Sequence, residues 1–151
     1  MSGLLTRDAL EQMIRHGEVD TVLMVFPDLW GRLVGKRTTG RFFLQQVASH
    51  GTENCDYLIA CDIENNPLPG YRFASYDQGY GDMLARADWA TARVVPWVDR
   101  TAMVMCDLVD VSTGNLIEVA PRTVLHRQVE AAAAMGFLPM VASEIEFYLF
   151  R

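Results

Sequence analysis

Apolar and polar residues near the start of the chain follow a helical period. Within residues 4–16, apolar residues recur three and four positions apart, which is typical of a helix with one buried face. Thr6 stands at the N-cap position, and Gly17 follows as a helix stop. The expected apolar face consists of Leu10, Met13 and Ile14. The pattern predicts a short amphipathic helix.

The next residues have the pattern of a β-hairpin followed by a second helix. Residues 19–26 are strongly apolar and predict a buried strand. Residues 27–31, Pro-Asp-Leu-Trp-Gly, supply turn residues, and residues 32–38 predict the returning strand. Residues 41–50 predict a short helix. Its buried side is expected to contain Phe42, Phe43 and Val47.

The middle of the chain mixes strand-like runs with loops. Strand character is predicted for residues 55–63, 91–95 and 101–110, with a short extended piece at 81–84. Residues 65–70 form a loop by composition. Residues 71–80 combine aromatic, Gly, Ser and Asp residues without a period, which predicts a long loop.

The last part of the chain predicts a helix and then a strand. Pro121 at a helix start, apolar residues inside and Gly136 at the end predict a well-delimited helix. Residues 140–150 predict a final strand. A strand this apolar needs cover on at least one face. Because the sequence ends on this strand, we expect the chain to be a truncated piece of a larger protein.

Composition and charge exclude several classes of protein. The 151 residues include 13 Lys and Arg against 19 Asp and Glu, a net charge of −6, whereas nucleic-acid binders usually have the opposite sign. No uncharged stretch reaches the ~18–20 residues that span a bilayer, and no basic-then-apolar leader is present. Three cysteines without a CxxC pair indicate reduced thiols. We expect a cytoplasmic protein with no nucleic-acid or membrane partner.

Two glutamates give the strongest chemical signal. On a strand, Glu144 and Glu146 would share one face, about 6.5–7 Å apart. Paired carboxylates bind hard cations such as Mg²⁺ or Mn²⁺, and this spacing suits two neighbouring ions. An edge strand with two solvated glutamates is the alternative. Tyr148 and Phe150 on the same face favour an enclosed site, because a solvated face rarely carries two aromatic residues beside its charges.

Several segments resemble the glutamine synthetase family. Its members carry a Glu-x-Glu-Phe-x-Leu-Phe strand, and residues 144–150 read Glu-Ile-Glu-Phe-Tyr-Leu-Phe. Residues 28–36 are similar to the Asp-x-x-Gly…Lys turn of its N-terminal domain. Further similar segments, in the family's order, are residues 80–83, 88–91, 96–97, 106–108, 121–122 and 136–137. The resemblance covers residues 18–150.

Independently of the resemblance, we interpret the basic residues Arg32, Lys36 and Arg37 as solvated charges of the hairpin.

The resemblance implies an α+β fold. A β-grasp N-terminal domain would be followed by the first helix and strand of a glutamine synthetase-type α/β catalytic domain, which is incomplete here. The expected units are an N-terminal helix at 1–17, the β-grasp domain at 18–111 and the start of the catalytic domain at 112–151. The resemblance also implies a homo-oligomeric ring, with active sites between neighbouring subunits.

The implied activity is that of an ATP-dependent ligase that joins glutamate to ammonia or a small amine through γ-glutamyl phosphate. Glu144 would bind the Mg²⁺ or Mn²⁺ ion at the nucleotide phosphates, and Glu146 the ion at the glutamate substrate. An N-domain loop of the family completes the next subunit's site with an acidic residue near the amine. Asp56 or Asp62 would take this part. The surrounding loop lacks the usual Asp-Gly-Ser-Ser run and resembles the branch in which other amines replace ammonia.

Two other functions fit the sequence less well than the ligase. A non-catalytic β-grasp binding or interaction module is disfavoured because such a module has no use for paired carboxylates on an enclosed face. A small metal-dependent phosphohydrolase is disfavoured because no His or further acidic cluster completes a site. Under the ligase hypothesis, these 151 residues by themselves are expected to be inactive.

Overall fold

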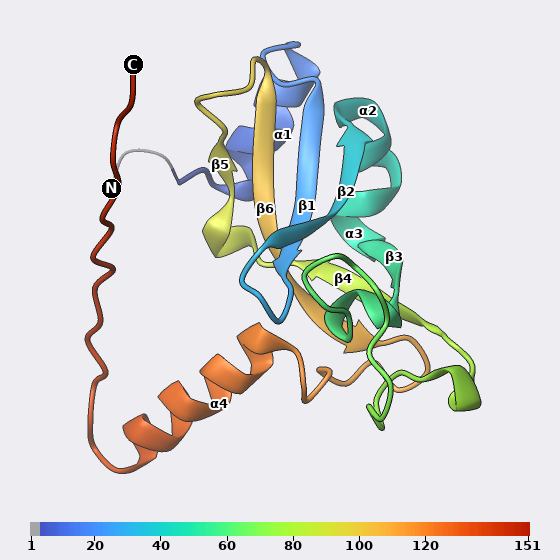
Figure 1. The fold of residues 1–151 in the computed structure, drawn as a ribbon. Coiled ribbons are helices and arrows are strands. Elements are labelled where there is room, and N and C mark those ends of the chain that lie inside the picture. The colour runs from blue at the N-terminus through green and yellow to red at the C-terminus, as the bar shows by residue number, and fades with distance from the viewer. Residues whose placement is uncertain (1–3) are drawn as a thin grey trace.

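The computed structural model describes residues 4–151, and its centre is a mixed β-sheet with helices on one face (Figure 1). The strands are β1 (Thr21–Pro27), β2 (Leu33–Thr39), β3 (Thr52–Cys55), β4 (Asp82–Ala87), β5 (Arg93–Val94) and β6 (Thr101–Asp110). The helices are α1 (Arg7–Arg15), α2 (Gly40–Phe42), α3 (Ala48–His50) and α4 (Pro121–Ala134). A π-helical turn, Phe43–Val47, joins α2 to α3, and 3₁₀ turns lie at Asp56–Ile59, Tyr76–Gln78 and Trp89–Thr91.

Strand β6 connects the two halves of the sheet. The strand order is β2-β1-β6-β4-β3, and β5 also pairs with β6. Residues 101–105 of β6 pair in parallel with β1, whereas residues 106–110 pair antiparallel with β4. The pairs β1–β2 and β3–β4 are antiparallel. A central parallel pair flanked by two antiparallel pairs, with a helical segment on one face, is a β-grasp arrangement. The predicted α+β fold class is therefore confirmed.

The N-terminal helix and the first hairpin form where the sequence predicted them. The Oγ1 of Thr6 accepts a hydrogen bond from the backbone N–H of Ala9 at 3.1 Å, which caps α1. In the hairpin, Gly35 adopts a φ of +147°, and a Cβ at this position would lie 2.0 Å from the carbonyl oxygen of Met24. The close approach of β1 and β2 therefore requires glycine here.

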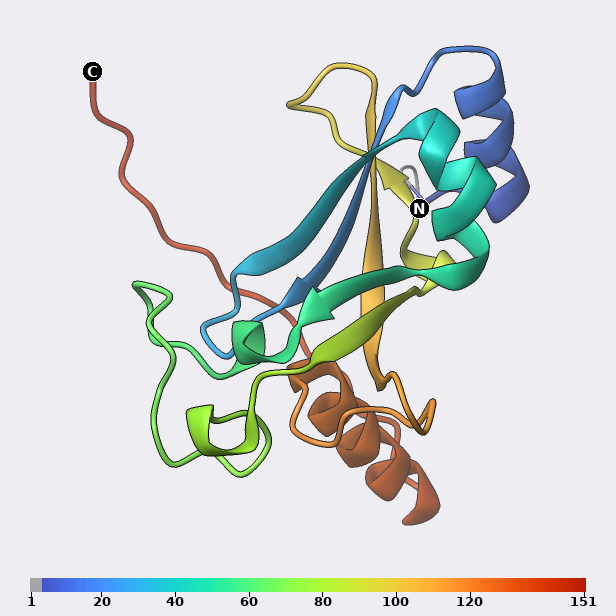
Figure 2. The same cartoon turned by 90° about the vertical axis from the view of Figure 1, so that its right-hand side faces the viewer.

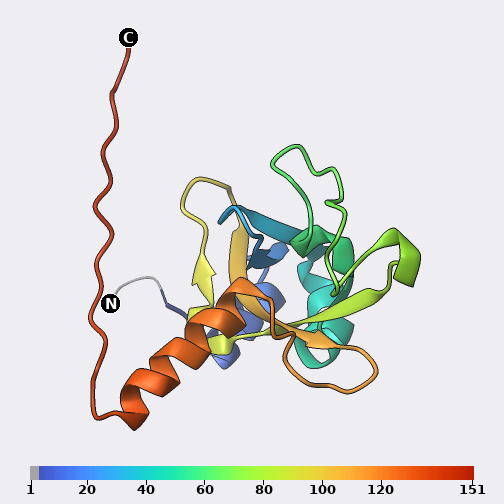
Figure 3. The same ribbon diagram turned by 60° about the horizontal axis from the view of Figure 1, so that its bottom comes forward.

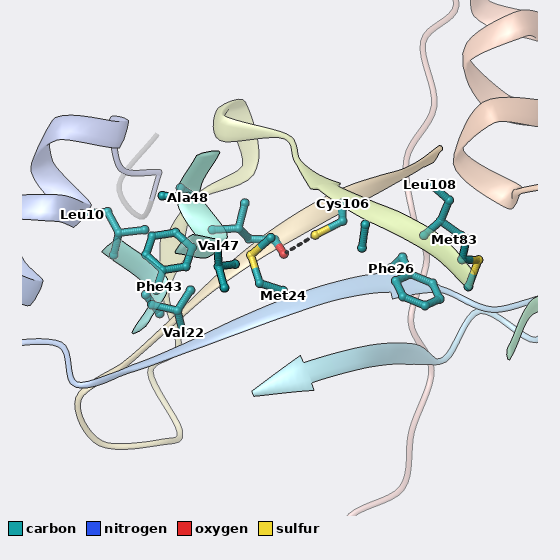
Figure 4. Packing of buried hydrophobic residues seen from close by; sticks show 14 of the residues in the cluster. Leu10, Val22, Met24, Phe26, Phe43, Val47, Ala48, Met83, Cys106 and Leu108 are labelled. Atoms are coloured by element: carbon teal, nitrogen blue, oxygen red, sulfur yellow. Dashed lines mark hydrogen bonds between the residues drawn. The ribbon is translucent and has the colours of Figure 1, made fainter. Parts of the chain in front are cut away.

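The hydrophobic core lies between the sheet and the helices (Figure 4). Alternate residues of β1 face the helices, and the fully buried Phe43 packs among them. The labelled members of this cluster are Leu10, Val22, Met24, Phe26, Phe43, Val47, Ala48, Met83, Cys106 and Leu108. On the other face of the sheet, Val25 packs with Val95 and Met103. Burial on both faces explains the strongly apolar run in residues 19–26.

The helix predicted at 41–50 forms as the α2–α3 segment, but one of its three predicted core residues is wrong. Phe43 and Val47 are buried, whereas Phe42 is 50% exposed. Consecutive residues of a helix point about 100° apart, so Phe42 and Phe43 cannot both face the sheet. The helical segment uses the second of these two residues for the core.

The strand predicted over residues 55–63 is wrong. Strand β3 ends at Cys55, and the apolar run that follows is the 3₁₀ turn Asp56–Ile59. Ile59 is buried in the core, and Leu58 packs partly against it. A short apolar run buries its side chains equally well from a strand or from a turn, so its composition did not distinguish the two.

The predicted lengths of two other strands also differ from the structure. The extended piece predicted at 81–84 is part of a longer strand, because β4 pairs with β6 as far as Ala87. The strand predicted at 91–95 is shorter in the structure. Its first residue belongs to the 3₁₀ turn Trp89–Thr91, and within 91–95 only the two residues of β5 pair with β6.

Helix α4 forms as predicted, but the strand predicted at 140–150 does not. After α4 the chain runs away from the sheet, as Figure 3 shows. Ile145 and Phe147 are 79% and 78% exposed, so this segment has no core face. A strand needs a neighbour for its backbone hydrogen bonds, and none of the described strands lies beside these residues. The predicted domain boundaries at 17/18 and 111/112 stay predictions.

The three cysteines are free thiols, as predicted. Burial raises the pKa of Cys106 to about 12, so this thiol stays protonated at neutral pH. Burial also raises the pKa of Cys61. None of the helices described for residues 4–151 has the length and hydrophobicity of a membrane-spanning helix.

The neighbouring phenylalanines of α2 and the π-helical turn provide a test of the core. We expect Phe43→Ala to lower the free energy of unfolding by about 3–5 kcal/mol, because it removes a fully buried ring. The control Phe42→Ala removes a half-exposed ring and is expected to change stability by less than about 1 kcal/mol. Urea unfolding followed by circular dichroism measures both values. Equal losses from the two variants would contradict the described packing.

Candidate functional site

Asp56 closes the base of a long loop between β3 and β4, which we call the 56–81 loop (Figure 2). The backbone N–H of Asp56 donates to the carbonyl of Gly81, and the N–H of Gly81 donates back to the Oδ2 of Asp56, both at 3.0 Å. The rings of Tyr57 and Tyr80 pack edge-on beside this point, with centroids 5.7 Å apart. Apart from the 3₁₀ turns Asp56–Ile59 and Tyr76–Gln78 the loop has no regular structure, and loops of this length are usually either functional elements or linkers.

Asp62 organises a tight turn within the 56–81 loop. Its Oδ1 accepts hydrogen bonds from the backbone N–H groups of Asn66 at 2.8 Å and Glu64 at 2.9 Å. The Nδ2 of Asn66 also donates to the Oδ2 of Asp62 at 3.1 Å. Hydrogen bonds from Asn66, followed by the one from Glu64, lower the pKa of Asp62. The carboxylate of Asp62 is therefore engaged in the turn itself.

The carboxylate of Asp56 is less engaged than that of Asp62. Its Oδ2 accepts from Gly81, but within the described residues its Oδ1 meets only the thiol of Cys55, at 4.0 Å. One carboxylate oxygen of Asp56 thus has no backbone donor. Of the two acidic residues predicted from the sequence, Asp56 is better placed than Asp62 to accept a hydrogen bond from a ligand.

A buried carboxylate holds the β1–β2 turn. Asp28 is 3% exposed, and its Oδ1 accepts from the backbone N–H groups of Trp30 and Arg32, each at 2.9 Å. Its Oδ2 accepts from the Nε of Arg32 at 2.6 Å. Burial alone would raise the pKa of Asp28, but the hydrogen bonds from Arg32 and Trp30 outweigh it and lower the pKa. Asp28 is therefore a charged, fixed acceptor.

Arg32 and Trp30 attach this turn to the 56–81 loop. The Nη1 of Arg32 donates to the carbonyl of Ile63, and its Nη2 donates to the Oδ1 of Asn65 at 3.0 Å. The indole N–H of Trp30 donates to the carbonyl of Cys61 at 2.9 Å. The interpretation of Arg32 as a solvated charge is wrong, because its guanidinium bridges two segments that are 31 residues apart in sequence. Lys36 and Arg37 are exposed, as expected.

A second arginine fixes the start of α4. The guanidinium of Arg122 is ion-paired with Asp88, and its Nε donates to the Oδ1 of Asp107 at 2.9 Å. Burial lowers the pKa of Arg122, but the bonds to Asp107 and Asp88 outweigh burial and raise it. The pair of carboxylates thus binds the first turn of α4 to β6 and to the segment after β4.

The two glutamates of the predicted metal site are exposed in the segment after α4. The enclosed face inferred from Tyr148 and Phe150 is not present within the described residues, since these rings are 88% and 86% exposed. No three His, Cys, Asp or Glu side chains of residues 4–151 converge on a metal position. Metal binding by Glu144 and Glu146 therefore stays a prediction.

An open groove lies elsewhere in the domain, lined mainly by residues of β2, of the α2–α3 segment and of β3. Its volume is about 1140 Å³, and its polar lining includes Lys36, His50 and Glu53. None of the four predicted site residues lines it. The predicted acidic residues of the loop and the groove are thus separate features of the surface.

Comparisons with known proteins agree with this fold. No family model matches the chain. The chain is 46% identical over 144 residues to gamma-glutamylethanolamide synthetase GlnA4 of Streptomyces coelicolor, which covers 95% of the chain and 31% of the relative. It is 32% identical over 146 residues to glutamate–isopropylamine ligase of a Pseudomonas species, and this alignment covers 97% of the chain and 31% of that relative. Human Lengsin is 29% identical over 160 residues, which covers 99% of the chain and 30% of that protein.

A solved structure of GmaS in complex with ADP has the same fold. It superposes with a TM-score of 0.62 at 21% identity, over 83% of this chain and 26% of that chain. The shared fold and the sequence relatives together indicate a glutamine synthetase-type protein. The chain belongs to the glutamine synthetase family, and its relatives include the γ-glutamyl-amine ligase branch. It spans about 31% of the length of the first two curated relatives.

The lowered pKa of Asp28 makes stability depend on pH in a defined direction. A carboxyl whose pKa is lower in the folded state stabilises that state above its ordinary pKa of 3.8 and loses this effect as the pH falls through the lowered value. At pH 7 we expect Asp28→Asn to lower the free energy of unfolding by about 2 kcal/mol. This difference from the wild type should shrink below the ordinary pKa of 3.8, because Asn resembles the protonated acid.

Urea unfolding over a series of pH values measures the effect. The control is Asp99→Asn, since Asp99 is exposed and should give a small difference at every pH. A difference for Asp28→Asn that stays constant to well below its ordinary pKa would contradict the described bonding of its carboxylate.

Proposed function

We propose that the chain is the N-terminal portion of an ATP-dependent glutamate–amine ligase whose acceptor is a small primary amine. The observation that carries the proposal is the 46% identity over 144 residues to a relative named for the glutamylation of ethanolamine. A second relative, at 32% identity, is named for isopropylamine. Both names favour an alkylamine over ammonia as the acceptor of this protein.

The reaction proceeds in two steps under this proposal. ATP transfers its γ-phosphoryl group to the γ-carboxylate of glutamate, which forms γ-glutamyl phosphate and ADP. The amine nitrogen then attacks the activated carbonyl carbon, a C–N bond forms, the C–O bond to phosphate breaks, and the amine loses a proton. Positioning and electrostatic stabilisation supply most of the catalysis in such phosphoryl transfers.

Glu144 and Glu146 are the proposed ligands for Mg²⁺ or Mn²⁺. Their carboxylates suit hard cations, and both are exposed and free of ion pairs within residues 4–151. When bound, the ions would neutralise the charge of the phosphates. Glu144 is assigned to the ion at the nucleotide, and Glu146 to the ion at glutamate.

The 56–81 loop is the proposed acceptor-binding element. Asp56 has a carboxylate oxygen without a backbone donor, so we assign it the hydrogen bond to the amine and the acceptance of its proton. Asp62, whose carboxylate is engaged in the turn, shapes the loop. In the full-length protein, a homo-oligomeric ring located in the cytoplasm, this loop would complete the active site of a neighbouring subunit. Activity would also depend on residues beyond the present chain.

Phosphate release by the full-length protein tests the function. We expect release to require ATP and glutamate together and to be stimulated by ethanolamine or isopropylamine more than by ammonia. Release that no amine stimulates would exclude the ligase and favour the β-grasp binding module. The chain by itself is expected to show no activity.

The two glutamates provide a separate test of the metal site. Glu144→Ala and Glu146→Ala should each lower kcat/KM by at least about 100-fold, since each removes a metal ligand. Isothermal titration with Mn²⁺ should show the corresponding loss of binding. The control is Glu130→Ala on the exposed face of α4, which should be as active as the wild type. Normal turnover of both variants would contradict the assignment of the metal ligands.

A further inference from the structure

Arg32 uses nearly every edge of its guanidinium to connect the β1–β2 turn to the 56–81 loop. One edge faces Asp28 through Nε at 2.6 Å. Its Nη1 donates to the carbonyl of Ile63, and its Nη2 donates to the carbonyl of Asp62 at 3.4 Å and to the Oδ1 of Asn65 at 3.0 Å. Arg32 thus contacts the same short turn that Asp62 organises from within.

The contacts are to the backbone of the loop more than to its side chains. Together with the bond from Trp30 to Cys61, the β1–β2 turn donates to three consecutive carbonyl groups, at positions 61, 62 and 63. Bonds to consecutive carbonyls fix the path of the chain, whatever side chains it carries. We call this set of bonds the carbonyl clamp.

Asp28 sets the direction in which Arg32 points. Its carboxylate is almost completely buried and accepts from the backbone and the side chain of Arg32 together. The side chain of Arg32 itself is 34% exposed, so it lies against the loop with part of its surface in contact with solvent. A planar guanidinium can serve Asp28 and the loop simultaneously, whereas the ammonium of Lys acts from a single point.

We propose that Arg32 is a positioning residue for the amine acceptor, through the carbonyl clamp. The clamp fixes the 61–65 turn, which follows directly on the 3₁₀ turn that begins at Asp56, and it thereby limits the movement of the acidic residues on that stretch of the loop. This inference rests on the proposed function of the loop. Its specific content is that loss of the clamp weakens amine binding without affecting ATP or glutamate.

The test compares Arg32→Lys with the wild type in the full-length enzyme. Hydrogen–deuterium exchange should become at least about tenfold faster at the amides of residues 61–66, since several bonds that hold the turn are lost. The KM for ethanolamine should rise about tenfold, which corresponds to the loss of one bond to a charged group. The KM values for ATP and glutamate, and kcat, should stay within about twofold.

Two further variants complete the design. Trp30→Phe retains the ring but removes the indole N–H, so it should shift exchange and the ethanolamine KM in the same direction by a smaller factor. It also provides a readout if Arg32→Lys does not fold. Arg37→Lys is the matched control, because Arg37 lies on β2, the strand that directly follows Arg32, and forms no ion pair within the described part of the chain.

Each outcome decides the proposal. Unchanged exchange at residues 61–66 in both variants overturns the clamp. Faster exchange with an unchanged ethanolamine KM, or with equal rises in all three KM values, overturns the positioning role and leaves only a contribution to stability. If the wild type shows no amine-dependent release, the proposed function and the acceptor role fail together, whereas the exchange comparison still decides whether the clamp holds the turn.

Discussion

Parallel pairing of β1 with β6 is the interaction on which the rest of this domain depends. It joins Thr21 to Thr101 and so fixes two segments that are far apart in sequence. The same strand then pairs with β4 through residues 106–110, and β4 in turn holds β3. The ends of β1 and β3 are thereby brought to one side of the domain. This is why the Asp28 turn and the start of the 56–81 loop can form hydrogen bonds with each other.

The sequence predicted those parts of the fold that depend on local patterns. The first helix had a cap and an apolar stripe, the first hairpin had turn residues between two strand-like runs, and α4 had Pro and Gly at its ends. The strand predicted around Ile59 was wrong because an apolar 3₁₀ turn and a strand have the same composition. The final strand was wrong for a different reason. Its alternating residues fit a strand, but strand formation also needs a neighbour that the described residues do not provide.

The candidate site was predictable only in its residue types. Asp56 and Asp62 stood in the region that the family resemblance indicated, yet their different bonding follows from contacts with Gly81 and Asn66 that no local pattern specifies. The bridging role of Arg32 could not be predicted, because a basic residue on a hairpin is usually solvated and its carbonyl partners lie in a distant loop. Asp28 is the only sequence signal for the ion pair of Arg32, since an acidic residue four positions before an Arg in a tight turn can bind that Arg. The assignments of Glu144 and Glu146 still rest on the sequence motif.

The bonded base of the 56–81 loop has a consequence for how such domains diverge. Because the chain enters and leaves the sheet at the paired residues Asp56 and Gly81, insertions or deletions between positions 69 and 79 do not alter the register of β3 with β4. Lengthening a loop whose ends are already joined adds little entropic penalty. The surface chemistry of this loop can therefore change by mutation while the sheet keeps its stability.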